Sequence, residues 1–308
     1  MKIIASPANY NEAISLIDNG IDVLLLGDSI HSTRMIYNCQ LDDLNAICNN
    51  KKQTEIWLNV NAFFYEQDLD ELEKYLKEIK QLKIDKVVFN DYAVAQIDFE
   101  QNLNLNLHYE PSALVTSYGQ LEFYLQNNIY SVSLSNELFL PEILTILKNK
   151  PKGMKICLQV QGFVLIMHSR WNLVTNFAQY LENSDDEYIK NKAIFIREEQ
   201  RKYKNIIFED NHGTHMFSGY ELCLIRYLKK MFDAGLDYIK NDNIMQTNNE
   251  YSLEYYKIYQ KLIDSIKNNN FDEKLIENLI FEAKEISTNE LAAGFVGGIK
   301  EIKHYEDI

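Results

Sequence analysis

Short apolar runs alternate with amphipathic stretches along most of the chain. The apolar runs have the length and composition of buried β-strands, and eight of them can be counted. They lie at 2–5, 22–27, 55–60, 86–90, 105–109, 130–135, 154–160 and 237–242. Between them, apolar residues recur at helical spacing, most clearly over 67–83, 140–149 and 251–268. The pattern therefore predicts repeated strand–helix units.

Strands that alternate with helices pair in parallel, because each helix returns the chain to the same edge of the sheet. Eight such units favour closure of the sheet, so we predict an α/β fold, a TIM-like (β/α)8 barrel. A doubly wound open sheet is the alternative. We expect residues 1–270 to form the barrel domain, and residues 271–308 to form a C-terminal helix and tail that pack on it.

The segment after the seventh strand is too long for a simple strand–helix connection. It covers residues 161–216, and AIFIREE and NIIFED within it predict a β-hairpin on either side of a polar turn. Long excursions from compact domains commonly form lids or binding loops. We expect this excursion to lie over the barrel mouth, and a helix over 221–234 to lead back into the barrel.

Composition narrows the classes of function. The formal net charge is −14 without any basic run, which argues against independent binding of nucleic acid. No apolar run approaches 18 residues and no leader pattern is present, so we expect a cytoplasmic protein with no membrane segment. The four cysteines are scattered, as is typical of a reducing compartment: Cys39, Cys48, Cys157 and Cys223.

In α/β barrels the functional residues stand where the strands end. The polar residues at those positions are our candidates for ligand binding: Arg34, Asn59, Asn61, Glu110, Lys240 and Asp242. Cations that converge at a barrel mouth suit a small anion such as a dicarboxylate, and arginine can hold a carboxylate through two bonds. We expect Arg34, Arg170 and Lys240 to converge in this way. The alternative is that each cation pairs with a nearby acid.

The excursion also carries three of the six histidines. His168, Arg170 and His215 are the candidates for catalysis, with the imidazoles suited to proton transfer. His212 and His215 stand three residues apart, but no H-E-x-x-H helix is present, and we expect no metal site. G-x-S-x-G, P-loop and G-x-G-x-x-G motifs are also missing from the sequence.

Five segments carry a resemblance that spans nearly the whole chain. They are SPANYNEAISLIDNGIDVLLLG, LNVNAFF, LQVQGFVLIMHSR, FSGYELCLIRYLKKMFDAGLDYIKND and LAAGFVGGI. Their order resembles the collagenase-like peptidase family U32. The stretches HSRWNLVTNF and IIFEDNHGTHMFS are most similar to a short bacterial subgroup linked to tRNA hydroxylation. The resemblance implies a barrel and a role in forming 5-hydroxyuridine at the tRNA wobble position, with prephenate required by the pathway.

The chain departs from this family at its cysteines. Where the family signature has two cysteines, Leu165 and Asn172 stand here, and the four cysteines present do not occupy the family's positions. Because an iron–sulfur cluster is usually held by four thiolates, we expect no cofactor in this chain. A cluster, if needed, belongs to a partner, which the resemblance implies is a longer, cysteine-bearing relative. tRNA would then be bound by the complex.

Two other functions remain open at this point. The family name implies a peptidase of unassigned catalytic type, although no nucleophile–base pair stands at a diagnostic spacing. A non-catalytic scaffold or small-anion-binding subunit would explain the missing cysteines.

Overall fold

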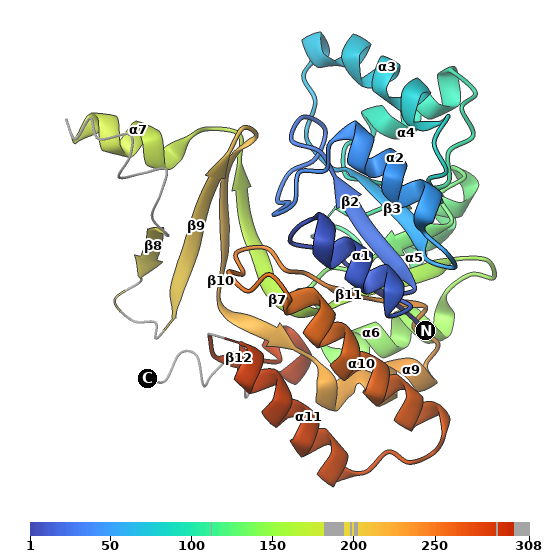
Figure 1. The fold of residues 1–308 in the computed structure, drawn as a ribbon, viewed down its shortest axis with the longest axis vertical. Coiled ribbons are helices and arrows are strands. Elements are labelled where there is room, and N and C mark those ends of the chain that lie inside the picture. Colours follow the sequence, from blue (N-terminus) through green and yellow to red (C-terminus); the bar gives the residue numbers. More distant parts are fainter. Residues whose placement is uncertain (112, 182–193, 198, 200–202, 288, 299–308) are drawn as a thin grey trace.

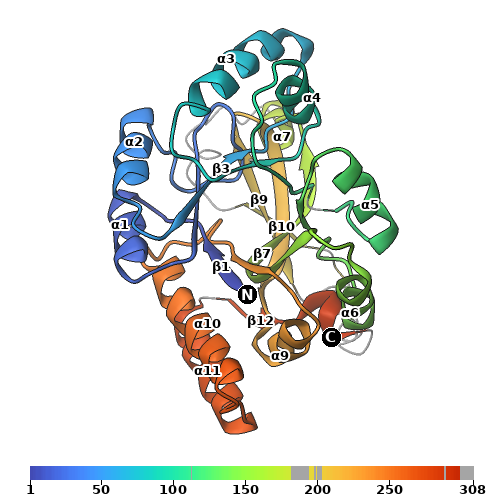
Figure 2. The ribbon, with the colours of Figure 1, turned by 90° about the vertical axis from the view of Figure 1, so that its right-hand side faces the viewer.

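Eight parallel strands close into a barrel in the computed structural model of the chain (Figure 2). The model describes residues 1–111, 113–181, 194–197, 199, 203–287 and 289–298. The barrel strands are β1 (Lys2–Ala5), β2 (Val23–Gly27), β3 (Glu55–Val60), β4 (Lys86–Phe89), β5 (Leu107–Tyr109), β6 (Ser131–Ser133), β7 (Lys155–Ser169) and β11 (Tyr238–Asn241). Because β11 pairs with both β1 and β7, the ring has no open edge. The predicted barrel is confirmed, and the open sheet is wrong.

Helices cover the outside of this barrel. They are α1 (Tyr10–Asp18), α2 (Leu41–Asn50), α3 (Leu69–Ile79), α4 (Ala93–Glu100), α5 (Tyr118–Gln126), α6 (Leu140–Asn149), α9 (Leu228–Asp233) and α10 (Tyr251–Lys267). The helix expected over 221–234 is shorter than predicted: Glu221–Cys223 end a strand, and a 3-10 turn at Ile225–Tyr227 precedes α9. Pairing of these residues with a neighbouring strand outweighs their helical spacing. None of the described helices is long and apolar enough to cross a bilayer.

Side chains that point into the barrel change character along its axis. At the N-terminal ends of the strands, Trp57, Cys157 and Tyr238 belong to a buried apolar cluster. Alternation along a strand then sends every second residue inward, so β3 adds Asn59 above Trp57 and β11 adds Lys240 above Tyr238. The outward residues pack under the helices in a larger core. The barrel interior is thus apolar near the N-terminal ends of the strands and polar at the mouth.

An arm of antiparallel strands projects from the barrel (Figure 1). We use "the arm" for residues 162–181, 194–197 and 203–223: the outer half of β7, α7 (Leu173–Tyr180), β8 (Ile194–Arg197), β9 (Lys204–Asp210) and β10 (Gly213–Cys223). The predicted hairpin is confirmed as β8 and β9, which pair antiparallel. The expected end of the seventh strand near residue 160 is wrong, because β7 continues and pairs with β10. The acidic stretch at 182–187 lies outside the described residues.

Gly162 makes the junction between barrel and arm. Its φ is +100°, and a Cβ atom there would lie 2.0 Å from the carbonyl oxygen of Asp242. A bulge in the pairing of β7 with β11 falls at the same level, where Asn241 pairs with Gln161. Only glycine fits so close to another backbone in this conformation, so this residue lets β7 leave the barrel and enter the arm.

The C-terminal segment packs on the barrel side of the molecule. Helix α11 (Glu273–Ile286) begins at Asp272, whose carboxylate accepts a hydrogen bond of 2.8 Å from the amide of Leu275. Ile276, Leu279 and Ala283 of this helix belong to the main core. A short strand, β12 (Leu291–Ala292), then pairs with β10, and a 3-10 turn follows at Gly294–Gly297.

Candidate functional site

The floor of the barrel mouth is a closed network of charges and hydrogen bonds. Lys240 Nζ lies 2.5 Å from Glu110 Oε1 and 3.3 Å from Asp242 Oδ2. The other oxygen of Glu110 accepts a 2.8 Å bond from Ser133 Oγ, which lies 2.9 Å from the fully buried His108 Nε2. Burial alone would raise the pKa of Glu110, but Lys240 and His108 hold it well below the usual value. Lys240 is therefore a paired cation, as the alternative in the sequence analysis expected.

The predicted asparagines stand beside this network and position a loop. The Oδ1 atom of Asn61 accepts a 2.9 Å bond from the backbone amide of Thr33. The backbone carbonyl of Asn59 accepts a hydrogen bond from the Ser32 hydroxyl. These contacts fix the loop between β2 and α2 against the mouth, and that loop carries Arg34.

Arg34 adopts an uncommon backbone conformation. Its φ of 60° lies in the left-handed region, which costs about 1–2 kcal/mol for a residue other than glycine. Among the described residues, no carboxylate lies within 4.0 Å of its guanidinium, although Glu110, Asp242 and Asp210 act on it at longer range. Burial lowers its pKa. Arg34 is thus a partly desolvated cation whose charge no ion pair compensates.

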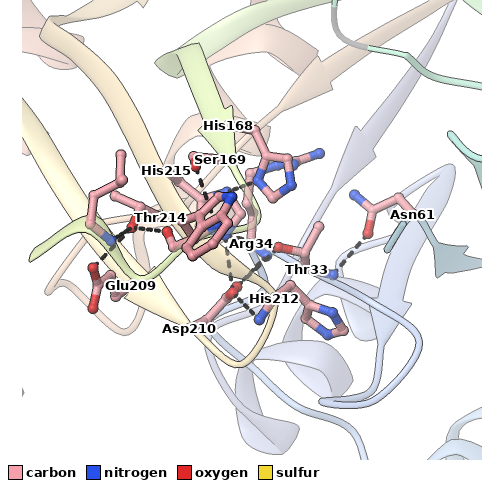
Figure 3. Close-up of polar contacts among 12 residues, drawn as sticks. Thr33, Arg34, Asn61, His168, Ser169, Glu209, Asp210, His212, Thr214 and His215 are labelled. Carbon is pink, nitrogen blue, oxygen red and sulfur yellow. Dashed lines mark hydrogen bonds and ion pairs between the residues drawn. The ribbon is translucent and has the colours of Figure 1, made fainter. Parts of the chain in front are cut away.

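Beside Arg34, the arm places a carboxylate and two imidazoles in a row (Figure 3). Asp210 Oδ1 lies 3.0 Å from His215 Nε2, and His215 Nδ1 lies 3.1 Å from His168 Nδ1. Asp210 also accepts a 2.9 Å bond from the Thr33 hydroxyl, which ties the arm to the barrel loop. His168 Nε2 is buried and has no hydrogen-bond partner within the described part of the chain. His168 and His215 therefore lie together, as candidates for proton transfer require.

A cavity of about 520 Å³ lies between the arm and the mouth. Its walls are mainly apolar and include Phe63, Leu165 and Phe295. The polar groups that line it include Arg34, His168, Asn136 and Glu137. Arg34 also lines a smaller cavity that continues down to Lys240 and Glu110. An apolar pocket with a few placed polar groups is the usual form of a small-molecule site.

Arg170 lies outside both cavities. Its guanidinium stacks 3.1 Å from the ring centre of Tyr65 and donates a 3.2 Å bond to the carbonyl of Phe63. The expected convergence of three cations is therefore wrong for Arg170, and holds for Arg34 and Lys240, which line the same cavity. The reason is that β7 continues to Ser169 in the arm, which carries the next residue past the mouth.

Sequence reasoning missed Asp210 as the anchor of the two imidazoles. The signal was present in the turn: FEDNHGTH places an Asn-His pair before a glycine between two apolar runs, which favours a tight hairpin. In that hairpin Asp210 pairs with Gly213, whose φ is +120°, and His215 follows two residues later on the same face. A hairpin register read from the turn would have brought Asp210 beside His215.

The four cysteines do not form a ligand set for an iron–sulfur cluster. Cys157 belongs to the apolar cluster inside the barrel, whereas Cys39 and Cys48 are buried in the core beneath the helices. Cys223 stands at the end of β10. Burial raises the pKa of the Cys157 thiol to about 12 and those of the other three to about 11. Leu165 contributes to an apolar cluster of the arm.

The fold and the site define an α/β-barrel protein whose mouth is covered on one side by a strand arm. The model of peptidase family U32 matches residues 8–306, so the chain belongs to this family. It is 27% identical over 267 residues to tRNA hydroxylation protein P2 of Bacillus subtilis, with 85% of each chain covered. It is 22% identical to tRNA hydroxylation protein P of Escherichia coli, over 84% of this chain and 67% of that protein. An uncharacterized protease of Methanocaldococcus jannaschii is 27% identical, over 88% of this chain and 67% of its own length.

Proposed function

We propose that this protein acts in tRNA hydroxylation, in the formation of 5-hydroxyuridine at the wobble position. The observation that carries the proposal is the similarity to tRNA hydroxylation protein P2, which covers 85% of both chains. The arm and its histidines lie inside the matched region of the family. The net charge of −14 supports a component that meets tRNA within a complex rather than alone.

The cavity under the arm supports a small anion as the ligand of this protein. Arg34 is the cation that such a ligand would meet, because Lys240 is already held by Glu110 and Asp242. The apolar walls would receive the ligand's hydrocarbon part. Prephenate, a dicarboxylate with a ring, belongs to this chemical class, and we propose it as the anion.

We also propose a cysteine-bearing relative as the protein partner, since the thiols here do not form a ligand set. Helix α7 supports a docking role for the arm. It carries no charged residue and none of its residues is buried, with Phe177 and Tyr180 exposed to 62% and 83%. Its N-terminal end is anchored through Glu209, which accepts bonds from the amide and hydroxyl of Thr175. Exposed aromatic side chains on a fixed helix suit a protein interface.

The contacts of His168 give no support to independent peptidase activity through a serine, threonine or cysteine nucleophile. Such a mechanism needs the nucleophile's hydroxyl or thiol within hydrogen-bond reach of the base. In the described part of the chain, His168 Nε2 has no such neighbour. Ser169, next in sequence, accepts a bond of 3.2 Å from the amide of Trp171.

Mass spectrometry of tRNA nucleosides tests the proposed function. A strain is made in which this protein and any protein with the same role are deleted. We expect its tRNA to lose wobble 5-hydroxyuridine, and we expect the wild-type chain to restore the modification. Arg34→Gln should fail to restore it. Arg226→Gln is the matched control, because Arg226 forms ion pairs with Glu273 and Glu277 on the outer surface. An unchanged nucleoside profile in the deletion strain would refute the role in tRNA hydroxylation.

A second experiment tests the docking surface. The tagged chain is co-expressed with a cysteine-bearing relative from the same organism and then purified through its tag. The relative should co-purify with the wild-type chain and should not co-purify with the double variant Phe177→Glu/Tyr180→Glu. Phe99→Glu serves as control, because Phe99 is 75% exposed on α4 of the barrel. Equal retention by both variants would rule out α7 as the contact.

A further inference from the structure

The row Asp210–His215–His168 fixes the position of every proton along it. Burial alone would raise the pKa of Asp210, but its bond to His215 holds it far below the usual value, so the carboxylate can only accept hydrogen bonds. His215 Nε2 must then carry a proton, which it donates to Asp210 over 3.0 Å. Burial lowers the pKa of His215, so the ring is neutral and its Nδ1 is bare.

The same reasoning passes to the second ring. A bare His215 Nδ1 accepts, so the Nδ1 of His168, 3.1 Å away, must be the donor. Burial, together with His215 and Arg34, lowers the pKa of His168 to about 4, so this ring is also neutral at pH 7. Its Nε2 is then a bare acceptor, buried and without a partner among the described residues, in a side chain that lines the cavity. An unpaired buried acceptor costs about 1–3 kcal/mol, which a ligand can relieve.

We propose that this row sets the ligand specificity of the arm cavity: His168 Nε2 accepts a hydrogen bond from a hydroxyl group on the anion that Arg34 holds. The inference rests on the proposed function, because it concerns the ligand of the same cavity. The ligand class is a carboxylate with an apolar body and a hydroxyl group. His168 is the specificity-determining residue, and His215 and Asp210 are positioning residues that keep its proton on Nδ1.

Three observations favour a hydroxyl group over a second carboxylate at this point. A carboxylate has no proton to offer a bare nitrogen and would repel its lone pair. The imidazole would have to gain a proton to bind it, and Arg34 opposes a positive charge on His168. The ring of His168 is also held in place, because it stacks on Phe63 and on His215 at centroid distances of 5.2 and 4.8 Å. A fixed acceptor discriminates strongly against ligands that lack the donor.

Nitrogen NMR of the histidine-labelled full chain tests the proton positions directly. We expect His168 in the Nδ1–H form, which is the less common form of a free imidazole, and His215 in the Nε2–H form. In Asp210→Asn, the new amide group can donate to His215 Nε2, so the whole row should invert and leave a proton on His168 Nε2. An Nε2–H form of His168 in the wild-type protein would overturn the inference, whatever the result of the tRNA experiment.

A matched pair of probes tests the ligand class. Calorimetry with 3-phenyllactate and 3-phenylpropanoate compares two carboxylates that differ only by a hydroxyl group. We expect the wild-type chain to bind phenyllactate at least tenfold more tightly, and we expect the preference to vanish in His168→Phe and in Asp210→Asn. His212→Gln is the control that should keep the preference, since only the backbone amide of His212 contacts Asp210. Equal affinities, or no binding of either probe, would refute the hydroxyl-bearing ligand class.

Discussion

Two groups of charged side chains meet at the barrel mouth, and they differ in how completely their charges are matched. On the barrel floor, Lys240, Glu110 and Asp242 form ion pairs at 2.5 and 3.3 Å. On the arm side, Arg34 has no ion pair among the described residues, and His168 Nε2 is an acceptor without a donor. The charges of the floor are matched by one another, whereas the arm side presents a cation and an acceptor that a ligand could match.

The comparison shows that polar residues at strand ends are not equivalent evidence for function. Both groups occupy the face where α/β barrels bind their ligands. Among the described residues, only the unmatched group combines a strained backbone, a cation without an ion pair and an orphaned acceptor beside a cavity. Such costs are usually retained where a ligand offsets them. We therefore propose that the floor residues stabilise the fold and that the arm-side residues bind the ligand. The following substitutions test this division.

Lys240→Met should have the largest effect, on stability. It leaves Glu110 buried without its cation, and we expect the free energy of unfolding in urea to fall by about 3–5 kcal/mol. Adding Glu110→Gln should restore much of that loss, because the orphaned charge is removed as well. Lys52→Met, which breaks the exposed pair with Asp18, should cost less than about 1 kcal/mol. A small effect of Lys240→Met would contradict the closed floor.

Gly162→Ala should have the second-largest effect on stability, because Gly162 lies at the junction between the barrel and the arm. The new methyl group would lie 2.0 Å from the carbonyl oxygen of Asp242, so either β7 or β11 must move. We expect a loss of about 2–4 kcal/mol in the free energy of unfolding. Gly153→Ala is a matched control, since its φ is +97° but nothing lies within 4 Å of the added atom. A loss of about 1 kcal/mol for both variants would mean that strain alone, not close approach, matters at Gly162.

The sequence predicted the barrel well because short, mostly apolar runs recur between helical stretches. The prediction failed at β7, which belongs to both the barrel and the arm. FVLIMHS at 163–169 has no turn before it, yet Gly162 bends β7 into the arm, and the φ of a glycine is not visible in a sequence. The pairing of β10 with β7 joins residues about 50 apart, and long-range partners of that kind cannot be read from local periodicity.

The candidate residues fared unevenly for the same reason. Asn59, Asn61, Glu110, Lys240 and Asp242 line the mouth as expected, because strand alternation dictates which side chains point inward. Arg170 was misplaced by the continuation of β7. Lys240 is paired and Arg34 is not, because of distances of a few ångströms between loops. Such distances cannot be predicted from the spacing of residues in the sequence.

Arg34→Gln tests the open side of the comparison through binding. Loss of the cation should weaken phenyllactate binding by about 10- to 100-fold, the usual value of a charge-assisted contact. The free energy of unfolding should change by less than about 1 kcal/mol, because no ion pair is broken. Arg226→Gln should leave binding unchanged. Parallel losses of binding and stability in Arg34→Gln would indicate that Arg34 supports the fold instead.

The smallest effect expected is a pH dependence of stability that comes from His168. Burial lowers its pKa to about 4 in the folded protein, and the groups that act on it there are His215 on β10, Arg34 on the β2–α2 loop, Asp210 on β9 and Arg170 beyond β7. An unfolded chain binds this proton near pH 6.5, so the stabilising contribution of a neutral His168 is complete above pH 6.5 and is lost as the pH falls towards 4.

The comparison to make is between the wild-type chain and His168→Asn, unfolded in urea at pH 7.5 and at pH 5.5. We expect the wild-type protein to lose about 1 kcal/mol more than the variant over this interval, since one proton contributes at most about 1.4 kcal/mol per pH unit below 6.5. The effect of His108, whose pKa is also lowered by burial, is present in both proteins and cancels in the difference. Equal losses would mean that His168 takes up its proton as readily as in the unfolded chain, so that its burial beside Arg34 does not keep the ring neutral below pH 6.5.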